Sequence, residues 1–377
     1  MRISKLWMWA AVCAAVLFSG QVSKAQYSDP MFTPVAFSKQ PMPGGEAPPM
    51  QPMAGMPATS YSCSDGNCGC DDCCGWSNRW QVFGEFLYLR PRDAEVAYGS
   101  IIDGPIVAGA PGLQAGRTGV LDYDYQPGFR IGGGFTLDNC NQIIASYSQL
   151  DATSNDVLAT AAPDVIRSLV IHPNSPNAGS NWLDAAADGQ VRFNILDVAY
   201  RGLLASCSDY EVGYLVGVRY ARLEQYFNST FTGVGVETVT SNVDFDGAGM
   251  RFGMDFERYG RNRQWFVYGK GYASLIGGRF ENDYLQSNQG DPVVAATTWE
   301  AGRVVTMLDL EAGLGWQSCS GNLRLSVGYM YSAWFNTIRQ NEWITAVQNN
   351  DFVANGMSTY DSGVTFDGLT ARVELLW

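Results

Sequence analysis

The sequence predicts an all-β fold: a transmembrane antiparallel up-and-down β-barrel of about 10 strands, with 8 to 12 admissible. Side chains alternate between apolar and polar with period two from Trp80 to Trp377. The segments that alternate are joined by connections that are short and long in turn. After residue 26 there is no uninterrupted apolar run of about 18 residues, which a membrane-spanning helix would need.

Residues 1–25 have the pattern of a secretory signal peptide. Two basic residues in MRISK precede the apolar run LWMWAAVCAAVLFSG, and Ser23 and Ala25 form a small-x-small cleavage site. The run is too short to span a bilayer. We therefore expect an exported protein whose mature chain begins at Gln26.

Residues 26–62 are rich in Pro and Met, poor in charge and without any period. Because proline removes backbone donors and the segment has little to pack, we expect a disordered, flexible tether. A Cys-rich segment, expected on the periplasmic side, follows at 63–79, and the barrel is expected at 80–377.

The chain end GLTARVELLW shows the alternation most clearly. Leu369, Val373 and Leu375 lie on one face of the predicted strand, whereas Arg372 and Glu374 lie on the other. An apolar face suits lipid and a charged face suits the barrel interior. The same pattern recurs in LDLEAGLGW and YEVGYLVGVRY. The predicted strands are 80–90, 127–137, 141–150, 191–206, 209–226, 243–257, 263–279, 303–317, 319–334 and 365–377.

The connections indicate which end of the barrel faces the periplasm. The short ones are DNCN, CS, YGRNR and a Ser318–Cys319 corner; the long ones are 91–126, 151–190, 227–242, 280–302 and 335–364. Short periplasmic turns that alternate with long external loops are typical of outer-membrane barrels. The sequence thus predicts the cell outer membrane, with its lipid as a partner. Trp377 ends an apolar face, as does the terminal aromatic signal read by the outer-membrane assembly machinery.

Three stretches resemble the Legionella-type major outer membrane protein family, porin-like barrels also found in planctomycete-type bacteria. They are WQVFGEFLYLRPRDAEVAYG, PGFRIGGGFTLDNCNQIIASYSQLDA and LDLEAGLGW, and the resemblance spans about residues 76–377. It implies an outer-membrane barrel with a pore or surface role, and it implies no catalytic residues.

If the apolar faces meet lipid, seven acids and seven bases point into the lumen. Unpaired charges in a narrow lumen are costly, so this balance predicts ion pairs in a partly water-filled interior. The alternatives are a narrow passage for ions or small solutes, or residues that only hold the barrel together. The set is Glu85, Arg130, Asp197, Arg201, Glu211, Arg219, Arg251, Asp255, Lys270, Asp309, Glu311, Arg324, Arg372 and Glu374.

Charge and motifs restrict the other functions. The net charge of −13 argues against nucleic acid as a partner. Acidic residues outnumber arginines in the long loops. These charges either keep the loops soluble or bind Ca²⁺ or Mg²⁺ loosely. Enzymatic barrels use a histidine base, and the single histidine, His172, has no Asp-x-His motif beside it. Asp164 and Ser168 are close to His172 in the sequence, but closeness along the chain does not by itself form a catalytic triad. We expect no catalytic residues, no metal site and no cofactor.

Eight cysteines of the mature chain all fall on the predicted periplasmic side. CxCxxCC could hold zinc, but an oxidising periplasm and an even count favour disulfides. These would form within the cluster, from the cluster to the turns, or between molecules and envelope partners. The candidates are Cys63, Cys68, Cys70, Cys73, Cys74, Cys140, Cys207 and Cys319.

Two functions remain open. The first is a porin-like passage for ions or small solutes, and the second is a non-conducting structural or adhesive surface protein anchored by the barrel. Barrels of about 8 strands are filled by side chains and those of 16 to 18 leave a channel, so about 10 strands lies near the filled end. Conductance separates the two functions.

Overall fold

The computed structural model describes residues 80–107, 112–138, 140–207, 209–233, 235–261, 263–350 and 363–377. The predicted signal peptide, the tether and the Cys-rich segment lie outside the described residues, as do the five cysteines Cys63, Cys68, Cys70, Cys73 and Cys74.

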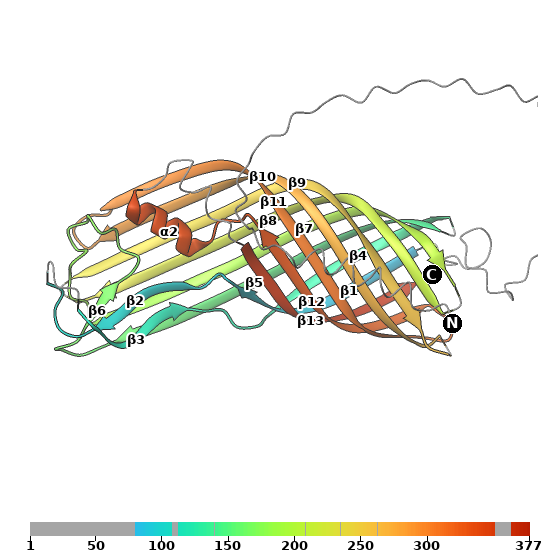
Figure 1. The fold of residues 1–377 in the computed structure, drawn as a ribbon, viewed down its shortest axis with the longest axis horizontal. Coiled ribbons are helices and arrows are strands. Elements are labelled where there is room, and N and C mark those ends of the chain that lie inside the picture. Colours follow the sequence, from blue (N-terminus) through green and yellow to red (C-terminus); the bar gives the residue numbers. More distant parts are fainter. Residues whose placement is uncertain are drawn as a thin grey trace, which may run out of the picture. The chain divides into compact units, whose positions relative to one another are not determined.

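Ten strands close into one barrel in which each strand pairs with its neighbours in antiparallel register (Figure 1). The order around the barrel is β1-β13-β12-β11-β10-β9-β8-β7-β5-β4. The prediction of ten strands is confirmed, and each predicted segment coincides largely with one barrel strand. The bounds are β1 Trp80–Arg92, β4 Gln126–Asp138, β5 Asn141–Ala159, β7 Asp184–Ser206, β8 Tyr210–Thr232, β9 Val236–Tyr259, β10 Trp265–Asn288, β11 Ala295–Gln317, β12 Leu323–Phe335 and β13 Gly363–Leu376.

Two features within the long connections were not predicted. Strands β2 (Val96–Ile102), β3 (Gln114–Leu121) and β6 (Val165–Ser168) form a separate sheet in the order β3-β2-β6. Helix α2 (Gln340–Asn349) lies in the last connection and contacts β8, β9 and β10 (Figure 1). No helix among the described residues is long and apolar enough to cross a membrane.

The strands differ in length around the barrel. β9 and β10 have 24 residues each, whereas β1 and β12 have 13. A strand of about 10 residues crosses the hydrocarbon, so the long strands continue far beyond it. We call the end with the short turns the turn end, and the opposite one the loop end. The extra length of β7 to β11 lies at the loop end (Figure 1).

The predicted long loops 227–242 and 280–302 are therefore wrong. β8 and β9 are joined across residues 233–235, and β10 and β11 across 289–294. The prediction ended these strands where the outward side chains become polar. The backbone continues as strand because the inward side chains, among them Phe231 and Phe280, stay fully buried.

The Ser318–Cys319 corner is also longer than predicted, because β11 ends at Gln317 and β12 begins at Leu323. Gly321 adopts φ +74° there, a conformation that glycine reaches without steric cost. Its N–H donates to the Ser318 carbonyl oxygen at 2.9 Å. The turn thus uses glycine at the position that requires it.

An apolar band surrounds the outer face of the barrel. On β8 the outward side chains are Val216, Val218 and Tyr220, each about 40 to 60 % exposed, and the next outward residues are Arg222 and Glu224. An aromatic residue at the boundary between apolar and polar side chains is typical of a membrane interface. The band is the face expected to meet lipid.

Candidate functional site

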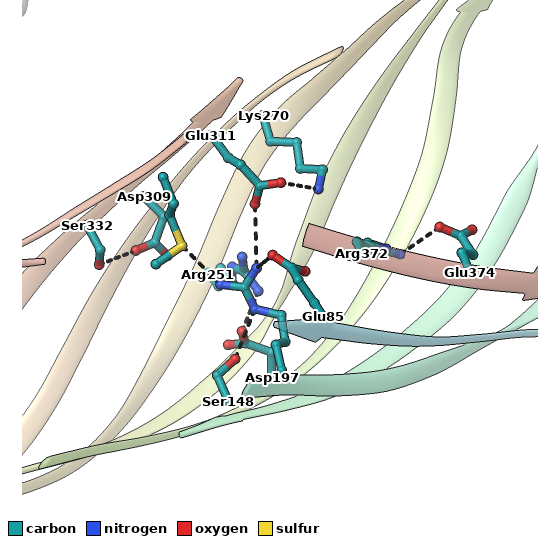
Figure 2. Close-up of polar contacts among 12 residues, drawn as sticks. Glu85, Ser148, Asp197, Arg251, Lys270, Asp309, Glu311, Ser332, Arg372 and Glu374 are labelled. Atoms are coloured by element: carbon teal, nitrogen blue, oxygen red, sulfur yellow. Dashed lines mark hydrogen bonds and ion pairs between the residues drawn. The ribbon is translucent and has the colours of Figure 1, made fainter. Parts of the chain in front are cut away.

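The barrel interior is the candidate site, and its half nearer the turn end is occupied by ion pairs. Figure 2 shows charged side chains that converge on one another from several strands. Period two places one side chain in two of each strand inside, so the ten strands deliver these groups to a common space.

The first cluster centres on Arg219 of β8. Its Nε lies 2.6 Å from Asp197 Oδ1 of β7, and its Nη1 lies 2.6 Å from Asp309 Oδ2 of β11. Arg251 of β9 also binds Asp197, at 2.6 Å, and the Ser332 hydroxyl donates to Asp309 at 2.6 Å. The side chain of Arg219 is only 3 % exposed. Each buried charge in this cluster therefore has a partner of opposite sign.

A second cluster joins β4, β1, β10 and β11. Arg130 Nη1 lies 3.0 Å from Glu85 and 3.5 Å from Glu311. Lys270 Nζ lies 2.8 Å from Glu311 (Figure 2). β4 and β11 are not neighbours in the barrel, so the contact between Arg130 and Glu311 crosses the lumen. Ser148 accepts a hydrogen bond from Arg130 at 3.0 Å.

Three further ion pairs lie nearer the turn end. Arg324 binds Glu257 at 2.5 Å, Arg372 binds Glu374 at 2.9 Å, and Arg201 Nε donates to Asp255 at 2.8 Å. Glu257 was missed by the sequence reasoning, although it lies two residues after Asp255 on the same face. Its position at the very end of a predicted strand hid it.

All 14 residues of the predicted lumen set lie in this part of the structure. Eleven line two small cavities of about 80 and about 90 Å³. Of the other three, Glu85 and Arg219 bind members of that group, and Glu211 lies at the turn end, 3.4 Å from Arg263. The eleven are Arg130, Asp197, Arg201, Arg251, Asp255, Lys270, Asp309, Glu311, Arg324, Arg372 and Glu374.

The half nearer the loop end is filled by apolar side chains. Phe193 of β7 meets Phe366 of β13 with ring centroids 4.9 Å apart, and Trp334 of β12 lies 6.1 Å from Phe366. β7 and β13 are not adjacent in the barrel, so the first contact also crosses the lumen. Leu87 and Leu89 of β1 are fully buried in the same core.

Helix α2 extends this apolar core towards the loop end. Trp343 is fully buried, its ring lies 6.3 Å from that of Trp299, and its Nε1 donates to the Asp283 carbonyl oxygen at 3.1 Å. Gln348 Nε2 donates to the Leu169 carbonyl oxygen at 2.8 Å. The helix is thus fixed to both the barrel wall and the connection between β6 and β7.

His172 lies in the connection between β6 and β7. Its Nε2 is 3.4 Å from Asn350 Oδ1, and its Nδ1 accepts the Asn174 N–H at 3.2 Å. The Ser168 hydroxyl oxygen accepts the N–H groups of Val170 and Ile171. Neither contact of the His172 ring is with an acid or a nucleophile. Within the described ranges, no group of three or more His, Cys, Asp or Glu residues forms a candidate metal site.

Three of the predicted disulfide candidates lie at turns of the turn end. Cys207 follows β7. Cys319 has an exposed free thiol that accepts a hydrogen bond from Gln264 at 2.9 Å. The N–H of Cys140 donates to Asp138 at 2.9 Å. The connectivity stays a prediction, because the other five cysteines are outside the described residues.

Trp377 closes the barrel together with Trp80. The N–H of Trp377 donates to the Trp80 carbonyl oxygen at 3.0 Å, and the Trp80 N–H donates back at 2.9 Å. The side chain of Trp377 is 58 % exposed on the outer face. Its role as an assembly signal stays a prediction.

Comparison with known proteins agrees with this architecture. A family model described as the Legionella pneumophila major outer membrane protein precursor matches residues 74–367. The chain belongs to this family. It is therefore a β-barrel of the cell outer membrane, as the sequence predicted. Among curated protein sequences none matches.

Several solved barrels are similar to the chain. The outer membrane protease OmpT from Escherichia coli has 12 % identity and a TM-score of 0.41, covering 84 % of this chain and 100 % of its own. Ail from Yersinia pestis has 9 % identity and a TM-score of 0.23, covering 79 % and 99 %. A FadL homologue from Pseudomonas aeruginosa has 12 % identity and a TM-score of 0.28, covering 79 % and 90 %.

Proposed function

We propose that the chain is a surface protein in which a closed barrel anchors an external β-structure in the outer membrane. The contact of Phe193 with Phe366 across the lumen, 4.9 Å between ring centroids, carries the proposal. It lies in a continuous buried core, and the ion pairs behind it leave cavities of only about 80 and 90 Å³. Each has room for a few water molecules.

The parts beyond the membrane support a surface role. The loop-end portions of β7 to β11 form a wall, and the β3-β2-β6 sheet and α2 pack into the same buried core as the barrel, with Tyr98 and Trp343 fully buried. Burial, followed by a hydrogen bond to Asp156, raises the pKa of the Tyr98 hydroxyl above its ordinary value. An ordered external structure is what a surface protein presents to its surroundings.

Conductance in planar bilayers tests the closed barrel. The folded wild-type protein is expected to give no unitary current steps. The variant Phe193→Ala with Phe366→Ala removes the two rings that meet across the lumen and is expected to conduct. Heat-modifiable migration on electrophoresis verifies that both proteins are folded. Stable unitary steps from the folded wild type would contradict the proposal.

A porin-like passage is the second candidate, and the two polar cavities favour it. They share Lys270, Tyr272 and Arg372 in their linings, so the two cavities adjoin within the charged half of the barrel. A passage would then open if the apolar side chains that fill the half of the lumen nearer the loop end moved aside. Steps from the wild type that disappear in a variant with α2 cross-linked to β10 would support this candidate.

An enzymatic role has little support from the contacts of His172, which meets Asn350 and Asn174. If the purified protein hydrolyses any peptide or ester, His172→Ala tests the one histidine of the chain. We expect such an activity to be unchanged, because the ring contacts neither an acid nor a nucleophile.

We also propose that disulfides fasten the turn end of the barrel, to itself or to neighbouring molecules. The location of Cys140, Cys207 and Cys319 at three turns of one end supports it. Electrophoresis of intact cells with and without reductant is expected to show faster-migrating or ladder-forming species that reductant removes. Free thiols on all eight cysteines together with stoichiometric zinc would overturn it.

A further inference from the structure

A hollow of about 500 Å³ opens on the outer face across β9 to β12. Antiparallel register places Phe256, Gly269, Ala312 and Tyr329 side by side in one row. Leu310 and Tyr331 continue the lining one step along the strands, and Lys270 and Glu311, whose side chains pair in the interior, complete it. The hollow lies within the apolar band.

Gly269 of β10 lines the hollow, and Gly271 lies two residues further along the same outward face of the strand. A Cβ added to Gly269 would meet no atom within 4 Å, and one added to Gly271 would only touch the Leu310 side chain at 3.6 Å. Some other barrel glycines have a steric cause: a Cβ on Gly249 would overlap the carbonyl oxygen of Leu275. Glycine weakens a strand, and it often marks a bulge, a bend, or the close approach of a ligand or another backbone.

The hollow leads to a polar cluster where the apolar band ends. The Tyr329 hydroxyl donates to Asp367, which is also paired with Arg92, and Tyr331 lies opposite Asp367 in the register. Tyr125 contributes a hydroxyl 3.4 Å from both Asp367 and Arg92. The side chain of Arg92 is 45 % exposed. A charged guanidinium and phenolic hydroxyls therefore border one end of an apolar hollow.

We propose that this hollow binds one acyl chain of a membrane phospholipid whose phosphate headgroup lies at Arg92 and the tyrosines. Three observations select this occupant. The hollow is part of the face that meets lipid, so acyl chains surround it. Its lining is apolar along the strands and polar only at one end, which matches an amphiphile. The polar end carries an exposed guanidinium, a preferred partner of phosphate.

Lipid retention measured by native mass spectrometry tests the proposal. The purified full-length protein in detergent is incubated with palmitoyl lysophosphatidylglycerol. The wild type is expected to keep one lipid. Gly269→Leu with Gly271→Leu fills the hollow and is expected to lower retention about tenfold, the equivalent of losing contact with two buried methylenes. Because each added Cβ has room, the variant barrel is expected to fold.

Gly84→Leu is the matched control. Gly84 lies on the outer face of β1, opposite Val373 and Ile131, and a Cβ there also meets no atom within 4 Å. It is outside the hollow, so its leucine variant is expected to retain lipid as the wild type does. Equal retention by the double variant and the wild type would overturn the proposal, as would loss of lipid in the control.

Two further measurements test the occupant and its headgroup. Monopalmitoylglycerol has the same acyl chain without a phosphate, and the wild type is expected to retain it several-fold less; Arg92→Gln is expected to remove that difference. Equal retention of the two lipids would overturn the headgroup assignment. A lipid-free dimer that forms with the wild type but not with the double glycine variant would show that a second copy of the chain occupies the hollow. That result would overturn the proposal.

Discussion

At the residue scale, the barrel interior contains buried charges that are tolerated only because each is paired with a charge of opposite sign. Arg219 is 3 % exposed and binds both Asp197 and Asp309 at 2.6 Å. Removing one member of a buried pair leaves a charge without compensation, which costs far more than the pair contributes. The balance of seven acids and seven bases expected from the sequence thus has an energetic reason.

The variant Arg219→Met is expected to lower the free energy of unfolding by about 3 kcal/mol, because Asp197 and Asp309 stay buried with fewer partners. Urea titration of the folded barrel in detergent, followed by tryptophan fluorescence, measures the loss. Arg222→Met is the control, since that arginine is 48 % exposed and pairs with Glu224 on the outer face. Its loss should stay within about 1 kcal/mol. Equal losses in the two variants would contradict the buried network.

At the element scale, α2 is held by its buried face. Trp343, Ile344 and Val347 are buried, whereas Thr345 is exposed and its hydroxyl donates to the Asn341 carbonyl oxygen within the helix. The helix has 10 residues, and helices this short are marginal in water without tertiary contacts. Its stability therefore comes from the barrel wall rather than from its own sequence.

Trp343→Ala is expected to detach α2 while the barrel stays closed in the membrane, because about 3 to 5 kcal/mol of packing is lost at one helix. Limited trypsin digestion measures the effect as faster cleavage after Arg339, which directly precedes the helix. Thr345→Ala serves as the control and should leave the cleavage rate unchanged. Resistance of the Trp343 variant equal to the wild type would show that the helix is held by other contacts.

At the scale of the whole molecule, closure joins the two ends of the described chain. Trp80 and Trp377 exchange two backbone hydrogen bonds, and β1 pairs with β13 along its length. In lipid every backbone polar group needs a partner, so an open edge is not tolerated. The chain end is thus both the last strand and the seam of the barrel.

Deletion of Trp377 is expected to lower the amount of folded barrel in the outer membrane severalfold, because the two backbone hydrogen bonds to Trp80 and the terminal aromatic side chain are lost. The heat-modifiable band of the outer-membrane fraction measures this. Trp265→Leu is the control, since that side chain is also exposed on the outer face, at 66 %, but lies at the start of β10. A similar loss in the control would assign the effect to aromatic side chains in general.

Period-two alternation predicted the barrel strands well, because one side chain in two faces a different medium. It predicted the lumen set for the same reason, but it overlooked Glu257, at the end of one predicted segment, and Arg303, at the start of another. It failed at 227–242 and 280–302, where outward side chains such as Asn228 become polar while inward ones such as Phe231 stay buried. Beyond the membrane the outward side chains face water and are polar. The apolar–polar alternation therefore changes there, although the backbone continues as a strand.

The sequence by itself determined the strand number, the face of each strand and the membrane, because these follow from local alternation and from the family. Only the tertiary structure decided which charges meet and whether the lumen is open. Arg130 and Glu311 are far apart in the chain, as are Phe193 and Phe366, and barrel closure brings each pair together. Contacts across a lumen depend on register and side-chain size together, which no single strand encodes.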